Sequence, residues 1–181
     1  DGHNESVAIS KALDKDRIEL IFSSPLKRAY NTIEPLARRK QKAIICSKNL
    51  MERGFGVVEG FEIGNIKSAK SHKQKLILRK TAEKNFRPDG GESLHDVYIR
   101  VTEFLNLLST IDVKGIIVCM THGGVLDILY RIIMNEPLSS ERKWEIPNGA
   151  LFLLERCKSD FKIIKWSEVS HLNSGGMLDE Y

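Results

Sequence analysis

The chain has 181 residues, of which 41% are hydrophobic and 29% charged, and its formal net charge is +4. This composition is ordinary for a globular protein, and one domain spanning residues 1–181 is the simplest organisation. No apolar run reaches the length of a membrane-spanning helix, so we expect no contact with a membrane. The net charge is too small to indicate nucleic-acid binding by itself, so we expect no nucleic-acid partner.

Helical and strand patterns alternate over the first fifty residues. Apolar spacing predicts a helix at 5–13, and the short apolar run 18–24 is typical of a buried strand. Ser24 followed by Pro25 then predicts the start of a helix, with the serine as its N-cap. The run 42–50 predicts a second strand.

The middle of the chain is less regular. Three glycines between 54 and 60 indicate a loop with unusual backbone angles. The basic stretch at about 61–91 has a weak pattern and predicts an insertion or lid. The stretch 92–108 predicts the clearest helix of the chain, because Ser93 and Asp96 are spaced like a capping box in front of a regular apolar stripe.

The remaining elements predict the fold class. Residues 115–120 predict a buried strand, 125–134 a helix, and 150–169 an antiparallel pair of strands. Strands that alternate with helices indicate an α/β domain with a largely parallel sheet. Ligands of such sheets bind beyond the carboxyl ends of the strands, where the polar turns 23–28, 50–56 and 120–124 are expected.

These three turns carry the candidate site residues. His122 follows a predicted strand and precedes Gly123, Gly124 and a helix, where free N–H groups and the helix dipole favour an anion. Arg28 is expected to face the same crevice, and a guanidinium suits phosphate because it donates paired hydrogen bonds. The alternatives are a histidine that caps the turn and an exposed helix arginine.

Glu52, at the head of the glycine-rich loop, can serve as a general acid that protonates a leaving alcohol and later activates water. The alternatives are a carboxylate that interacts with a helix dipole and an ion pair with Arg53. No metal-binding cluster and no Walker motif is present, so we expect no metal and no cofactor. The cysteines, each within an apolar run, are predicted to be buried reduced thiols, which favours a cytoplasmic location; they are Cys46, Cys119 and Cys157.

The order of these motifs resembles the histidine phosphatase superfamily, the phosphoglycerate mutase-like proteins. "SSPLKRAYNT" is similar to the family's Ser-Pro-Leu-x-Arg turn, "LMERGFGVVEG" to its acid loop, "GGES" with Arg100 to its Gly-Glu-Ser helix start, and "MTHGGV" to its second-histidine turn. Four motifs in the right order and spacing are far more specific than any one of them.

The resemblance implies a three-layer α/β/α sandwich with a largely parallel mixed sheet. It also implies metal-independent phosphoryl transfer through a phosphohistidine. Arg28, His122 and Gly123 would bind the phosphoryl group, His122 and Glu52 would be catalytic, and Arg53 would contact the substrate. Glu59 and Glu92 are expected to hold loops through backbone N–H groups instead.

One motif of the family is not found. The nucleophilic histidine belongs to an Arg-His-Gly motif after the first strand, whereas His3 resembles the start of the family's first helix. We therefore expect the first strand and its motif upstream of Asp1, and the 181-residue chain alone to be inactive or nearly so.

Three functions remain open at this point. We favour a phosphatase that acts on small phosphate esters. A phosphoglycerate mutase-type transfer is the first alternative, since Arg53 is similar to a residue of the mutase loop. A non-catalytic member that binds phosphorylated ligands or a protein is the second. The sequence names neither the substrate nor the oligomeric state.

Overall fold

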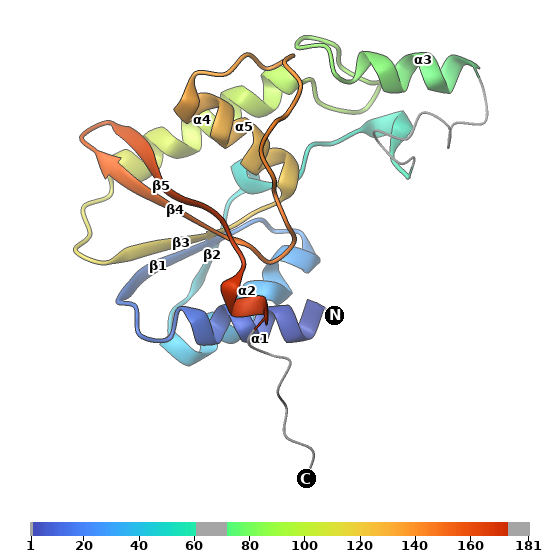
Figure 1. Ribbon diagram of the computed structural model, residues 1–181. Helices are drawn as coiled ribbons and strands as arrows, with labels where there is room; N and C mark the ends of the chain where they lie inside the picture. The colour runs from blue at the N-terminus through green and yellow to red at the C-terminus, as the bar shows by residue number, and fades with distance from the viewer. Residues whose placement is uncertain (1, 61–71, 174–181) are drawn as a thin grey trace.

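A three-stranded parallel sheet forms the centre of the fold (Figure 1). The computed structural model describes residues 2–60 and 72–173. Strand β1 (Ile18–Ser23) lies between β2 (Ile44–Cys46) and β3 (Ile116–Met120), and both neighbours run parallel to it. The carboxyl ends of the three strands therefore meet at one edge of the sheet.

Helices cover both faces of this sheet. On one face lie α1 (Gly2–Ala12) and α2 (Lys27–Lys40), and on the other lies α4 (Leu94–Thr110), which packs against α5 (Gly123–Met134). Alternate side chains of the strands point to opposite faces. One set packs against α2 and consists of Ile18, Ile21, Val118 and Met120. The other packs against α4 and consists of Leu20, Phe22, Ile117 and Cys119. The predicted α/β/α layers are confirmed.

The C-terminal strands form a sheet of their own within the described part of the chain. β4 (Leu151–Cys157) and β5 (Asp160–Glu168) pair in antiparallel fashion, as predicted, and α6 (Ser170–Asn173) follows them. Both tryptophans lie where this hairpin meets α5. The ring of Tyr130 stacks on Trp144 at 4.0 Å and meets the edge of Trp166 at 4.9 Å, and Phe152 lies 4.5 Å from Trp166.

Two predicted boundaries are wrong. Helix α2 begins at Lys27, and its N-cap position is Leu26, so Ser24 does not cap it. The second strand is only three residues long. Ser47 N–H still bonds to the carbonyl of Ser23, but the chain then turns into the 3-10 helix η1 (Lys48–Leu50) and leaves the sheet.

The prediction of three buried thiols is also wrong. All three cysteines are unpaired, but Cys46 and Cys157 are exposed, because they end β2 and β4 at sheet edges. Only Cys119 lies inside, where burial raises the pKa of its thiol to about 12.

The predicted lid is described only in part. Residues 61–71 lie outside the described residues, and α3 (His72–Lys80) follows them. Leu78 of α3 packs on Val58 of the 3-10 helix η2 (Gly56–Val58), at one end of the fold in Figure 1. Its function as a lid stays a prediction. None of the described helices is long and apolar enough to cross a membrane.

The capping box of α4 is confirmed. Ser93 Oγ accepts a hydrogen bond from Asp96 N–H at 3.1 Å, and Asp96 Oδ2 accepts from Ser93 N–H at 2.7 Å and from Ser93 Oγ–H at 2.6 Å. The hydrogen bond from the Ser93 side chain is the main reason why the pKa of Asp96 falls from 3.8 to about 2, and Arg87 adds to the shift.

Replacing Asp96 by alanine is expected to lower the free energy of unfolding by about 1 kcal/mol at pH 7. Because the folded state depresses the pKa, this stabilisation is complete above pH 3.8 and is lost as the pH falls toward 2. Urea unfolding between pH 7 and pH 2 measures it, with exposed Asp112→Ala as the control. A gap between wild type and D96A that stays constant down to pH 2 would contradict the prediction.

Candidate active site

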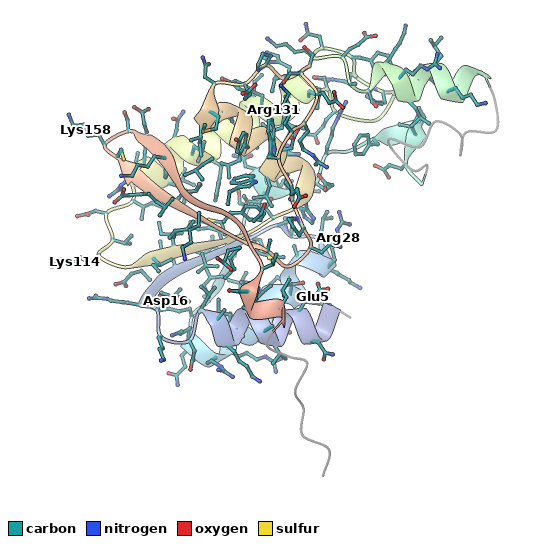
Figure 2. The ribbon with its side chains drawn as sticks, viewed as in Figure 1. Glu5, Asp16, Arg28, Lys114, Arg131 and Lys158 are labelled. Atoms are coloured by element: carbon teal, nitrogen blue, oxygen red, sulfur yellow. The ribbon has the colours of Figure 1, made fainter. Side chains whose placement is uncertain are left out.

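The turns after β1 and β3 lie side by side. Ser24 N–H donates to the carbonyl of Met120 at 2.9 Å, which extends the parallel pairing of the two strands by one bond. Ser23 and Ser24 are completely buried at this point. In Figure 2, Arg28, after β1, and Lys114, before β3, are at opposite ends of the sheet, so Arg28 marks its carboxyl end.

His122 and Arg28 are in direct contact although 94 positions separate them. Arg28 Nε–H donates to His122 Nδ1 at 3.3 Å. His122 occupies the N-cap position of α5, but its side chain makes no capping bond, so the alternative of a merely capping histidine is wrong. The predicted meeting of the guanidinium and the imidazole is therefore observed.

Hydrogen bonds fix the tautomer of His122. Since Nδ1 accepts from Arg28, the ring proton is on Nε2 and is donated to Ser24 Oγ at 2.8 Å. That oxygen also accepts from Leu26 N–H at 3.3 Å. Burial lowers the pKa of His122, and the charges of Arg28 and Arg100 lower it further, whereas Glu52 opposes them. The imidazole is therefore neutral at neutral pH.

Glu52 lies at the N-terminus of α5, beside the histidine. Its Oε2 is 3.5 Å from Gly124 N, and its Oε1 accepts from Arg53 N–H at 3.0 Å. A Cβ atom on Gly124 would lie only 2.4 Å from Oε1, so the carboxylate can be here only because residue 124 has no side chain. The predicted acid and the predicted phosphate-binding pair thus lie in one place.

Gly123 adds a backbone N–H donor to the candidate site. As the first residue of α5, it has no helical acceptor for its N–H, which leaves that donor for an anion near the helix N-terminus. The side chain of exposed Arg28 makes a single hydrogen bond with the described residues, through Nε. Its two terminal nitrogens are left to bind a ligand. The described residues around His122 therefore offer a cation, N–H donors, an imidazole and a carboxylate.

Arg53 lies elsewhere. It is 7% exposed, and it donates from Nε to the carbonyl of Glu92 at 2.9 Å and from Nη1 to that of Thr81 at 2.8 Å. Burial lowers its pKa. It makes no ion pair with Glu52 among the described residues, and its contact with substrate stays a prediction.

Two other carboxylates hold loops, as predicted. Glu92 Oε2 accepts from Gly54 N–H at 3.0 Å, and Glu59 Oε1 accepts from Phe55 N–H at 3.3 Å. Arg100 forms a bidentate pair with Glu92, at 2.8 and 3.0 Å, and also donates to the carbonyl of Asn49 at 2.8 Å. Residues 49–54, which carry Glu52 and are called the acid loop below, are therefore tied to α4.

The sequence interpretation named three further residues of this arrangement without giving them these contacts: Ser24, expected as an N-cap, Arg100, cited only for its likeness to the family's helix start, and Gly124. A signal for Ser24 existed, because a serine at the end of a buried strand requires a hydrogen-bond partner. Arg100 and Gly124 act through residues 51 and 72 positions away, respectively. No local pattern reveals such pairs.

Comparisons with known proteins agree on one family. A model of the histidine phosphatase superfamily (branch 1) matches residues 1–169. Phosphoglycerate mutase-like protein 4 of Arabidopsis thaliana is 29% identical over 98% of this chain and 76% of its own length. Phosphoserine phosphatase 1 of Hydrogenobacter thermophilus is 23% identical over 94% of this chain and 80% of its own.

Solved structures show the same fold. A phosphoserine phosphatase from Entamoeba histolytica, solved in complex with 3-phosphoglyceric acid, superposes with a TM-score of 0.75 at 18% identity. The match covers 93% of this chain and 82% of that one.

Proposed function

The chain belongs to the histidine phosphatase superfamily, and from that premise we propose that it hydrolyses small phosphate esters without a metal ion, by way of a phosphohistidine. The observation that carries the proposal is the contact between Arg28 and His122 beside the carboxylate of Glu52. These groups come from three separate turns, and a substrate phosphoryl group is the ligand that would use all of them.

Arg28, His122 and Gly123 bind the phosphoryl group in this proposal. The terminal nitrogens of Arg28 donate paired hydrogen bonds to two of its oxygens. The N–H of Gly123 and the dipole of α5 favour the same negative charge. His122 stabilises the transferred charge through Arg28, whose Nε–H its Nδ1 accepts, and Ser24 holds the orientation of the imidazole ring. Positioning and electrostatic stabilisation supply most of the catalysis in phosphoryl transfer.

The reaction has two steps. A histidine nitrogen attacks phosphorus, the P–N bond forms, the P–O bond to the alcohol breaks, and Glu52 gives its proton to the leaving oxygen. In the second step Glu52 takes a proton from water, the water oxygen attacks phosphorus, and the P–N bond breaks to release inorganic phosphate. The attacking histidine would be that of the family's Arg-His-Gly motif, which does not occur in the 181 residues.

The position of Glu52 supports an enzyme rather than a phosphate-binding module. A carboxylate next to a phosphate site repels the bound dianion and weakens simple binding. The same group is useful if a proton must be given to a leaving alcohol. The missing Cβ of Gly124 leaves room for the carboxylate beside the N-terminus of α5, which is compatible with this role.

Arg53 favours a phosphatase over a mutase. A mutase must hold a second acidic group of its substrate, and Arg53 is the residue that the sequence offers for it. Two of its three guanidinium nitrogens are bound to backbone carbonyls, and the side chain is almost fully buried. The names of several relatives, phosphoserine phosphatases among them, point the same way.

Trapping the intermediate tests the proposal. The full-length gene product, mixed with radiolabelled phosphoserine and quenched within milliseconds, is expected to carry a phosphate that is stable in alkali and lost in acid, the behaviour of phosphohistidine. Turnover is expected to be unchanged by EDTA. Label on serine or aspartate would contradict the mechanism. Failure to hydrolyse any phosphate ester would contradict the function.

A further inference from the structure

We propose that Arg100, through its pair with Glu92, is a positioning residue that fixes Glu52 for proton transfer to the leaving alcohol. The inference rests on the proposed function and deepens it. Arg100 lies on α4, outside the three turns that form the crevice, and it acts through the backbone of the acid loop.

Arg100 holds the start of the acid loop. Its side chain is 13% exposed, and three of its nitrogens are engaged. Nε and Nη2 bind the two carboxylate oxygens of Glu92, and Nη1 binds the carbonyl of Asn49 at 2.8 Å. Because the guanidinium is planar, the pair with Glu92 sets the direction in which Nη1 points.

Glu92 holds the end of the same loop. Its carboxylate accepts from Gly54 N–H at 3.0 Å, and its own N–H donates to the carbonyl of Gly54 at 2.8 Å. Burial by itself would raise the pKa of Glu92, but hydrogen bonds from Arg100 and Gly54 and the charge of Arg100 outweigh it and leave the pKa below the ordinary value. The pair therefore stays ionised through the neutral range.

Glu52 lies between these two attachments. A third attachment comes from Thr121, one residue before His122. Its Oγ1 donates to the carbonyl of Leu50 at 2.8 Å. Within the described part of the chain, the carboxylate itself accepts from the N–H of its neighbour Arg53 at 3.0 Å and lies 3.5 Å from that of Gly124. Its position therefore depends on the backbone that carries it, and the clamp of Arg100 and Glu92 holds both ends of that backbone.

Loss of the Arg100 clamp is expected to slow some substrates more than others. A displacement of about 1 Å in a catalytic group can cost on the order of 100-fold in rate. Loss of the clamp harms proton donation, but it leaves Arg28, His122 and Gly123 in place. Esters of alcohols need that proton, whereas dinitrophenol leaves as a stable anion without it. A defect in Glu52 positioning is thus expected to depend on the leaving group.

The test compares two substrates in the full-length gene product. For Arg100→Ala we expect kcat/KM to fall about 10-fold or more with phosphoserine and to stay within about threefold with dinitrophenyl phosphate. The parameter kcat/KM covers only the steps up to the phosphohistidine, so it excludes the second use of Glu52. Arg100→Lys, which keeps the charge but not the planar fork, is expected to show the same selectivity more weakly.

Arg87→Ala is the matched control. Arg87 makes the same kind of bidentate pair with Asp96 near the same end of α4, and among the described residues it makes no hydrogen bond to the acid loop. This variant is expected to leave both substrates unaffected.

Three results would overturn the inference. The first is an equal loss with both esters in Arg100→Ala and Arg100→Lys, which indicates a general structural role. The second is no loss with either ester. The third is an inhibition constant for inorganic phosphate that rises more than about 10-fold in both variants. That result would indicate that Arg100 binds phosphate itself. Wild-type protein that turns over neither ester instead refutes the proposed function itself.

Discussion

Replacing His122 by alanine is expected to lower kcat/KM for phosphoserine by about 100- to 1,000-fold in the full-length gene product, the loss seen when one contribution to charge stabilisation is removed. The variant lacks the imidazole beside the phosphoryl group. It also leaves Arg28 Nε and Ser24 Oγ without their partner, so the phosphate-binding guanidinium loses its fixed orientation. Steady-state kinetics with phosphoserine and dinitrophenyl phosphate measures the effect, and both esters are expected to be affected.

His95→Ala serves as the control for this variant. His95 lies in the first turn of α4, where its ring stacks on Tyr98. Its loss is expected to change kcat/KM by less than about threefold, as is usual for a group outside the reacting centre. Thermal unfolding of both variants shows that the fold survives. Near-normal turnover by folded H122A would refute the assigned role of His122.

Replacing Gly124 by alanine is expected to lower kcat/KM for phosphoserine by about 100-fold. The new Cβ would lie 2.4 Å from Glu52 Oε1, far inside any real contact, so the carboxylate must move away from the helix N-terminus. As with loss of the Arg100 clamp, dinitrophenyl phosphate is expected to be affected much less, because its leaving group needs no proton.

Gly123→Ala is the informative comparison. A Cβ atom at this position meets only Ile146 Cγ2, at 4.0 Å, and the N–H that would bind phosphate is retained. We expect its loss in kcat/KM to be at least about 10-fold smaller than that of G124A. Equal losses in the two variants would show that the helix start, and not Glu52, is what the extra methyl group disturbs.

The sequence was a good guide to elements that are regular and apolar. β3 and α4 were predictable because one is a uniformly apolar run and the other has a capping box before a regular stripe. The meeting of Arg28 with His122 was predictable for a topological reason: both follow parallel strands, whose carboxyl ends share an edge.

The errors arose where a local pattern competes with a tertiary contact. Ser24 has the composition of an N-cap, but His122 binds its hydroxyl group and the helix starts later. The predicted strand 42–50 extends past the end of β2 into the polar residues 47–49. There the backbone turns into η1, and the carbonyl of Asn49 accepts a hydrogen bond from Arg100. Cys46 is exposed because β2 is an edge strand, which its apolar neighbours do not reveal.

The placement of the two tryptophans has a practical consequence for spectroscopy. Both indoles lie in the contact between α5 and the C-terminal hairpin, far along the chain from β1 and β2. Tryptophan fluorescence is therefore expected to change when the hairpin detaches from α5. It is not expected to respond to unfolding of β1 and β2. Ellipticity at 222 nm is dominated in this chain by α2, α4 and α5 and follows the unfolding of these helices. A fluorescence midpoint of thermal unfolding that lies below the ellipticity midpoint would show that the hairpin separates first.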